Sequence, residues 1–307
     1  MSWLVLVIIT VIFDSLRIFI DNYTSDVYFK DRQAVSQKLF FGYLFVIASI
    51  IVTAISGFEF LTLPISTLAL LFVAGLFSSF SGIPYYKALE IDDSTNIGIF
   101  IQLSPILYLI FGWFLLGETF SPFQLIAFAI VLAGPLLIVL SSRKRSRKVK
   151  MRAVFYAALY VLIDVLGNII FVKENLAGIN FITEIAIVFL GKGIGNLLIV
   201  YCIPKWRKRF KNVIKSSKKK VFRPLSLNFT ASIIKDFTYR GALTTAPAVA
   251  IASVASDSAE PIVIFFMGIL LTLIWPKFGR EKLDRKTVIV HLLATILVVI
   301  GIVLMQL

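Results

Sequence analysis

Ten long apolar runs constrain the fold of this chain more than any other feature. They lie near residues 3–23, 38–57, 64–87, 96–117, 122–141, 152–172, 180–203, 226–246, 248–275 and 287–306. A helix needs about 20 residues to cross roughly 30 Å of hydrocarbon, and each run has that length. Of the 307 residues, 59% are hydrophobic, more than the roughly one half of a soluble domain. The sequence therefore predicts an all-α membrane protein with ten transmembrane helices.

The basic residues predict how these helices are oriented. Of 31 Lys and Arg, 26 lie in or beside the loops after the odd-numbered runs, and only Lys173 lies in an opposite loop. The positive-inside rule places the basic loops in the cytoplasm and both termini outside, most simply in the inner membrane of a prokaryote. The net charge of +14 then needs no nucleic acid partner, because stretches such as "KWRKRFKNVIKSSKKK" serve as solvated loops near anionic lipid headgroups.

Residues suited to enzymatic chemistry are scarce. The chain has one cysteine, Cys202, and one histidine, His291, which argues against a disulfide framework, a metal site and a Ser/His/Asp triad. Glycine-rich phosphate loops are absent from the sequence as well. We therefore expect no metal, no cofactor and no enzymatic activity.

The two halves of the sequence resemble each other. "QLSPILYLIFGWFLLGE" places a glycine seven residues after Pro105, and "DSAEPIVIFFMGILL" does the same after Pro261; "VIFDSLRIF" recurs as "VLIDVLGNI", with Asp14 and Asp164 in register. Five helices in each half force the second half to insert upside down, as in many secondary transporters. We predict two inverted-topology repeats, residues 1–142 and 152–307, joined by a basic cytoplasmic linker at 143–151. Pro105 and Pro261 are predicted to break their helices.

These residues also resemble a known family. The stretch from "YYKAL" to "AGPLLIVL" is similar to the EamA-type module of the drug/metabolite transporter superfamily, through Ser104, Pro105, Gly117, Glu118 and Gly134. The second half matches at Ala242, Leu243, Glu260, Pro261, Gly268 and Gly301, but "WPKFGREKLDRK" replaces its Gly-Glu pair. The resemblance implies a ten-helix transporter of amino acids, drugs, metabolites, sugars or their phosphates, commonly coupled to protons or working by exchange.

Charged residues inside the apolar runs are the candidates for function. An ionisable side chain at membrane depth costs a few kcal/mol, so it must face a partner or water. Asp14, Arg17 and Asp21 lie at i, i+3 and i+7, on one face of the first helix. Arg17 bridging the two aspartates as a structural salt bridge is one interpretation of this face. Asp14 and Asp164 occupy equivalent positions in the two halves, which makes both of them candidates for proton coupling.

Further polar residues complete the predicted substrate site. It comprises Asp14, Gln102, Asp164, Lys192, Lys235, Tyr239 and Glu260, which we expect to line one central cavity. Lys192 and Lys235 lie about ten residues from either end of their spans, too far to reach the interface, so each is either a substrate ligand or a fixed partner of a carboxylate. Lys235 and Asp236 are not expected to pair, because neighbouring residues diverge by about 100° on a helix.

These residues predict a secondary transporter of small polar metabolites. Midplane charges of both signs favour amino acids or related zwitterions, moved by alternating access with proton coupling or exchange. An anion, sugar-phosphate or nucleotide-sugar exchanger, with Lys192, Lys235 and Arg240 clamping phosphate, is the first alternative. A non-transporting membrane scaffold or lipid-handling protein is an alternative of another class, but it would have no need for so many charges within its spans.

Overall fold

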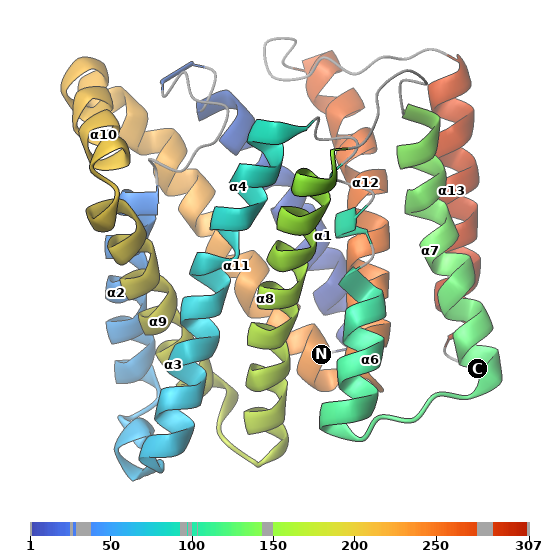
Figure 1. Cartoon of the computed structure of the whole chain (residues 1–307), viewed down its shortest axis with the longest axis horizontal. Coiled ribbons are helices and arrows are strands. Elements are labelled where there is room, and N and C mark those ends of the chain that lie inside the picture. Colours follow the sequence, from blue (N-terminus) through green and yellow to red (C-terminus); the bar gives the residue numbers. More distant parts are fainter. Residues whose placement is uncertain are drawn as a thin grey trace. The chain divides into compact units, whose positions relative to one another are not determined.

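Helices are the regular secondary structure of the described part of the chain. The computed structural model describes residues 2–24, 27–28, 38–92, 97, 100–102, 104–142, 150–274 and 285–305, and no strand occurs among them. The helices are α1 (Trp3–Thr24), α2 (Lys38–Ile55), α3 (Ile65–Phe80), α4 (Gly82–Ile91), α6 (Ser104–Leu116), α7 (Pro122–Ser142), α8 (Met151–Leu176), α9 (Phe181–Cys202), α10 (Pro204–Ser217), α11 (Phe222–Thr245), α12 (Val249–Ile274) and α13 (Arg285–Leu304), with short 3-10 turns η3 (Glu59–Thr62) and η4 (Lys218–Val221) (Figure 1).

Among the described residues, seven helical stretches are long and apolar enough to cross a membrane. They are Trp3–Thr24, Lys38–Ile55, Ile65–Ala88, Pro122–Ser141, Met151–Leu176, Phe181–Cys202 and Val249–Leu271, and two shorter apolar helices span Ser104–Leu116 and Val288–Leu304. A multi-pass helical membrane protein is thus confirmed, whereas the count of ten spans stays a prediction. The predicted eighth span coincides with α11, the most polar of the helices at the predicted positions. Residues 143–149 of the predicted linker lie outside the described residues.

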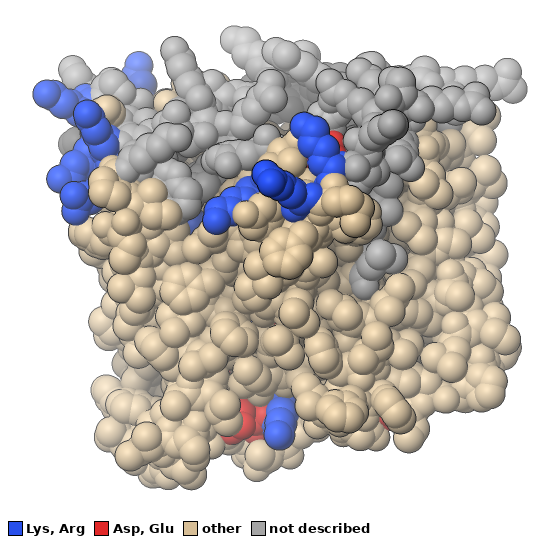
Figure 2. Space-filling model, in the orientation of Figure 1, with Lys and Arg blue, Asp and Glu red and all other residues tan. Residues whose placement is uncertain are grey.

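The basic segment after α9 differs from the expected loop, because most of it forms the helix α10. Its Phe210 and Ile214, four residues apart and so on one face, pack against the fully buried Val221 and Leu225. Lys208, Lys211 and Lys215 are exposed, and the Lys and Arg over α10 appear as the blue atoms at the upper left of Figure 2. Lys and Arg are good helix formers, so a docked apolar stripe is enough to order this segment.

The chain groups into two compact units, each drawing on both halves of the sequence. Unit 1 comprises Met1–Phe19, Ala88–Ala158 and Ile234–Leu307, and unit 2 comprises Ile20–Lys87 and Leu159–Ile233. The predicted boundaries 1–142 and 152–307 describe sequence repeats rather than compact units, and they stay a prediction.

In unit 2, α9 packs closely against α3. A Cβ atom on Gly75 would lie 2.2 Å from the carbonyl oxygen of Val188, and one on Gly191 would lie 2.2 Å from that of Phe72. The Ser79 hydroxyl on α3 donates a 2.6 Å hydrogen bond to the carbonyl oxygen of Lys192. Small residues let helix backbones approach in this way, which is the usual basis of helix association in membranes.

The contacts between α2 and α9, also in unit 2, are reciprocal. A Cβ on Gly42 would meet Leu197, which lies four residues after Gly193, and a Cβ on Gly193 would meet Val46, which lies four residues after Gly42. On each helix, therefore, a glycine is followed four residues later by a large apolar residue, and each glycine faces the large residue of the other helix. This is the pattern of an interface between two elements related by a two-fold axis.

Unit 1 contains a second reciprocal pair, α7 and α13. A Cβ on Gly134 would lie 2.6 Å from Val298, three residues before Gly301, and a Cβ on Gly301 would lie 2.3 Å from Val131, three residues before Gly134. The two glycines lie in similar stretches of the two halves, "IVLAGPLLIVL" for Gly134 and "LVVIGIVLMQL" for Gly301. The internal similarity of the sequence is thus accompanied by a local two-fold contact.

The turn between α6 and α7 holds the beginning of α12, also within unit 1. Gly117 has a φ of 73°, a conformation that favours glycine, and it directs Glu118 back so that its backbone N–H donates to the Gly112 carbonyl oxygen. The Glu118 carboxylate accepts a 2.6 Å hydrogen bond from the backbone N–H of Val249. The sequence before α12 is "APA", without a capping side chain, so Glu118 acts as its N-cap.

The two prolines predicted to break helices lie in different settings. Pro105 is the second residue of α6, where the missing N–H of proline would have no helical partner anyway. Pro261 lies inside α12, which continues past it to Ile274.

Candidate functional site

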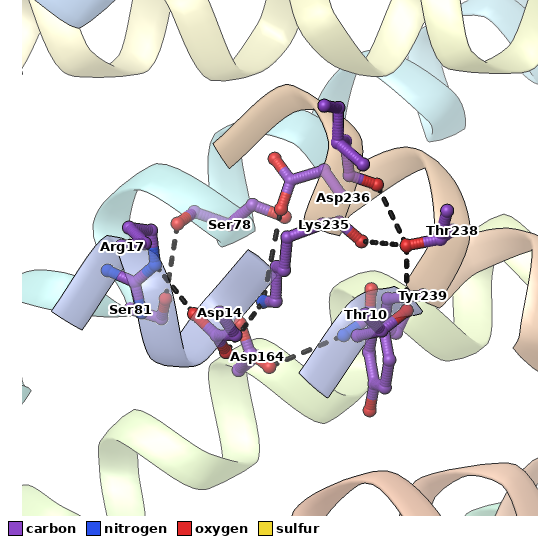
Figure 3. A network of polar contacts seen from close by, with 12 residues as sticks. Thr10, Asp14, Arg17, Ser78, Ser81, Asp164, Lys235, Asp236, Thr238 and Tyr239 are labelled. Carbon is purple, nitrogen blue, oxygen red and sulfur yellow. Dashed lines mark hydrogen bonds and ion pairs between the residues drawn. The ribbon is translucent and has the colours of Figure 1, made fainter. Parts of the chain in front are cut away.

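The charged face of α1 begins a polar cluster in unit 1. The Arg17 Nε donates a 2.6 Å hydrogen bond to Asp14 Oδ1, three residues earlier, as the spacing predicts. The Asp14 side chain is 13% exposed and that of Arg17 is 31% exposed. The Asp14 half of the bridge considered for Arg17 is therefore present, whereas its pairing with Asp21 stays a prediction, and Asp14 keeps its second oxygen for another partner (Figure 3).

That partner is Lys235 of α11. Its ammonium lies 3.8 Å from Asp14 Oδ2 and 3.9 Å from Asp236 Oδ1. The expectation that Lys235 and Asp236 do not pair is wrong. The four-carbon stem of the lysine is long enough to curve across the roughly 100° that separates neighbouring residues on a helix.

Aromatic and hydroxyl groups surround the same lysine. The ammonium of Lys235 lies 5.3 Å from the centre of the Tyr239 ring, which is a cation–π contact. The Tyr239 hydroxyl donates to the buried Tyr108 hydroxyl at 3.2 Å, joining α11 to α6. Thr238 and Thr10 hydrogen-bond at 2.8 Å, joining α11 to α1 (Figure 3). Tyr239 is thus part of the cluster.

Helix α12 contributes two carboxylates to unit 1. Asp257 accepts hydrogen bonds from Ser104 at the start of α6, at 2.5 Å, and from Ser253, at 3.4 Å. Glu260 is half-buried one turn later, where the charges of Asp14, Asp257, Arg17 and Lys235 act on its carboxylate.

Gln102, just before α6, differs from these residues in its hydrogen bonding. Its side-chain carbonyl oxygen is buried and accepts no hydrogen bond from any residue that the structure describes. Buried polar atoms are nearly always hydrogen-bonded, so a donor other than the described residues is expected to meet this oxygen.

The other two predicted site residues belong to unit 2. Asp164 of α8 accepts a 3.3 Å hydrogen bond from the Asn168 amide one turn later. The ammonium of Lys192 on α9 lies 4.6 Å from the centre of the Phe45 ring on α2. Asp14, Lys235, Tyr239 and Glu260 are therefore brought together in unit 1, and the cavity predicted to join all seven residues stays a prediction.

Several polar residues were not predicted. Thr10, Thr238 and Tyr108 carry no charge and interrupt no apolar run, so hydropathy gives no signal for them. Glu184, in the first turn of α9, is fully buried and accepts from the Asn175 side chain at 2.8 Å. Its sequence neighbours "FITEIAI" contained that signal, because a carboxylate stands alone in an apolar run.

Comparisons with known proteins agree with this architecture. Residues 1–140 match the model of the EamA-like transporter family. No curated protein matches the chain. A solved structure described only as "Crystal structure of protein" is similar over 96% of this chain and 95% of its own, at 16% identity and a TM-score of 0.62, which supports the fold alone. The resemblance inferred from the sequence is confirmed over residues 1–140, nearly the first half of this multi-pass membrane protein, which are similar to the EamA-like transporter family.

Proposed function

We propose that the protein is a secondary transporter that moves small polar metabolites by alternating access. The observation that carries the proposal is the cluster of Asp14, Arg17, Lys235 and Asp236, in which charges of both signs meet between α1 and α11. Placing four charged groups within an apolar helical protein is costly, and binding a polar solute is a function that requires it. The family match of residues 1–140 points to the same activity.

Amino acids or related zwitterions are the proposed substrates. A substrate with both an ammonium and a carboxylate finds complementary groups on both sides of the cluster. The ammonium of Lys235 already faces two carboxylates, so it is poorly placed to clamp a phosphate, which favours zwitterions over anions. The side-chain oxygen of Gln102, which accepts no hydrogen bond within the described part of the chain, gives a further acceptor for a substrate ammonium.

Ten helices in two inverted repeats, with Asp14 and Asp164 as equivalent coupling residues, form the proposed frame. The reciprocal contacts of α2 with α9 and of α7 with α13 support a two-fold relation between the halves. Each aspartate lies beside a neutralising or hydrogen-bonding group, Arg17 for Asp14 and Asn168 for Asp164. We propose that one of them takes up and releases a proton as access alternates, with both termini on the extracytoplasmic side of the membrane.

Uptake into proteoliposomes tests the proposal. The full-length protein is reconstituted, and accumulation of radiolabelled amino acids, sugars, sugar phosphates and nucleotides is measured with and without a pH gradient. Accumulation of an amino acid that depends on the gradient is the expected result. Uptake of sugar phosphates alone would favour the anion exchanger, and no uptake of any compound above protein-free liposomes would contradict a transport function.

A further inference from the structure

The ion pairs of Lys235 differ in kind from that of Arg17. Arg17 Nε lies 2.6 Å from Asp14, the length of a direct hydrogen bond between charged groups. The ammonium of Lys235 lies 3.8 and 3.9 Å from its two carboxylates, about 1 Å beyond that length. Its side chain is 26% exposed, twice the 13% of either aspartate. Lys235 is thus held by attraction from both sides without a short bond to either carboxylate.

The place that this ammonium occupies has the chemistry of an amine-binding site. Two carboxylates, Asp14 and Asp236, supply negative charge, and the face of Tyr239 supplies a cation–π contact. A primary ammonium on a small molecule would be recognised by the same three groups. The lysine therefore competes with any amine that enters the cluster.

We propose that Lys235 is a tethered counter-ion, and that the substrate is a zwitterion that inserts into the ion pairs between Lys235 and the two aspartates. This inference rests on the proposed transport function and specifies its ligand. In the empty protein the lysine neutralises the carboxylates. When the substrate enters, its ammonium takes the place between Asp14 and Asp236, and its carboxylate binds the displaced ammonium of Lys235.

The charges balance at each stage of this exchange. A zwitterion adds no net charge, so the cluster has the same total charge with and without substrate. The two attractions of Lys235 for the aspartates are replaced by three: the ligand ammonium with Asp14 and with Asp236, and the ligand carboxylate with Lys235. A simple amine would displace Lys235 without giving it a new anion, and a simple acid would bind Lys235 but leave the aspartates without a cation. Both fragments therefore leave a charge uncompensated at membrane depth, which is costly.

The lysine is suited to this movement and the neighbouring arginine is not. Lysine carries a compact charge on a flexible four-carbon stem with freely rotating donors. Arg17 is fixed to Asp14 by a short bond and has a planar, permanently charged group, so it holds Asp14 in position while Lys235 moves.

Matched ligands test the inference on the full-length protein in detergent. The probes are alanine, leucine and phenylalanine, each with the amine left by removing its carboxyl group and the carboxylic acid left by removing its amino group. Apparent affinities are obtained from ligand-induced increases in unfolding temperature over a concentration series. For at least one amino acid, the wild type should bind the intact molecule about tenfold or more tightly than either fragment.

Variants then assign the preference to Lys235. In Lys235→Ala the preference for the amino acid over its amine should fall by about tenfold, because the competitor of the amine and the partner of the carboxylate are both gone. Asp14→Asn should weaken the amino acid and the amine alike. Lys173→Ala, which removes the same charge from the exposed end of α8, should keep the wild-type preference. Lys235→Gln, of similar length, replaces the alanine variant if that protein fails to fold, with the same expectation.

An unchanged preference in the folded Lys235 variants would overturn the inference, and so would a wild type that binds a fragment as tightly as the intact amino acid. The proposed function is judged separately, by uptake into proteoliposomes. If the wild type transports other metabolites but binds none of these probes, the transporter assignment stands and the inserted zwitterion is refuted.

Discussion

Replacing Gly75 with alanine should separate α3 from α9 and destabilise unit 2. The added Cβ would lie 2.2 Å from the Val188 carbonyl oxygen, where ordinary contact begins at 3.4 Å, so the helices must move apart by about 1 Å. The obstacle is backbone, which cannot rotate away as a side chain can. The same movement stretches the 2.6 Å hydrogen bond from Ser79 to the Lys192 carbonyl beyond the range of a good hydrogen bond.

The cost follows from these two losses. Overpacking a close interface costs about 1–3 kcal/mol, and the stretched hydrogen bond costs about 1 kcal/mol more. The free energy of unfolding should therefore fall by roughly 2–4 kcal/mol, which corresponds to a decrease in Tm of roughly 5–15 °C.

Thermal unfolding of the full-length protein in detergent, followed by intrinsic fluorescence, measures this decrease. Gly178→Ala is the control, because Gly178 has a φ of 89° and open space around it, so its substitution adds only left-handed strain of about 1–2 kcal/mol. If Gly75→Ala unfolds at the wild-type temperature, or no lower than Gly178→Ala, the close approach of α3 and α9 is not what the structure indicates.

Three other perturbations have defined outcomes. Burial raises the pKa of Glu118 above its ordinary value of 4.5, against the backbone N–H groups of Val249 and Ala250 that lower it. The folded protein therefore holds this proton more tightly than the unfolded chain, so the thermal stability of the wild type relative to Glu118→Gln should fall as pH rises from about 4 through the raised pKa; a constant difference would contradict this assignment. In proteoliposomes, Asp164→Asn should abolish accumulation driven by a pH gradient but keep counterflow exchange, which moves no net proton, and equal loss of both would leave Asp164 a site residue without a coupling role. A reporter active only in the cytoplasm should stay inactive when fused to the C-terminus, whereas an active fusion would show that the number of spans is wrong by one.

The parts of the fold that hydropathy encodes could be predicted from the sequence. Helices occupy positions within all ten predicted runs because an apolar stretch of about 20 residues has few other stable conformations in a bilayer. The helix α10 could not be predicted in this way, since its ordering depends on Phe210 and Ile214 packing onto residues that follow it in sequence. A run of lysines and arginines indicates a charged segment. It does not show that one face of that segment packs against the rest of the protein.

In the candidate site, contacts between residues close in sequence could be predicted, and contacts between residues far apart in sequence could not. Asp14 and Arg17 pair at i, i+3, a spacing visible in the sequence, and the structure has that bond. Thr10 and Thr238 are 228 positions apart, and no local pattern brings two threonines together. The pairing of Lys235 with Asp236 could not be predicted from their spacing, because helix geometry fixes where side chains start, whereas the length and flexibility of a lysine decide where its charge lies.

The cap that Glu118 places on α12 has a consequence for how the chain is made. Val249 follows Glu118 by 131 residues, so the ribosome synthesises five further helices, α7 to α11, before the capped N–H exists. Until the two meet, α12 begins with backbone groups that only water or lipid headgroups can satisfy. The second half of the chain, synthesised alone, would lack this carboxylate from the start. Assembly of α12 is therefore a late event that depends on a turn synthesised early. In a truncated or split chain, the start of α12 at Val249 should be the first part of the helix to lose its order.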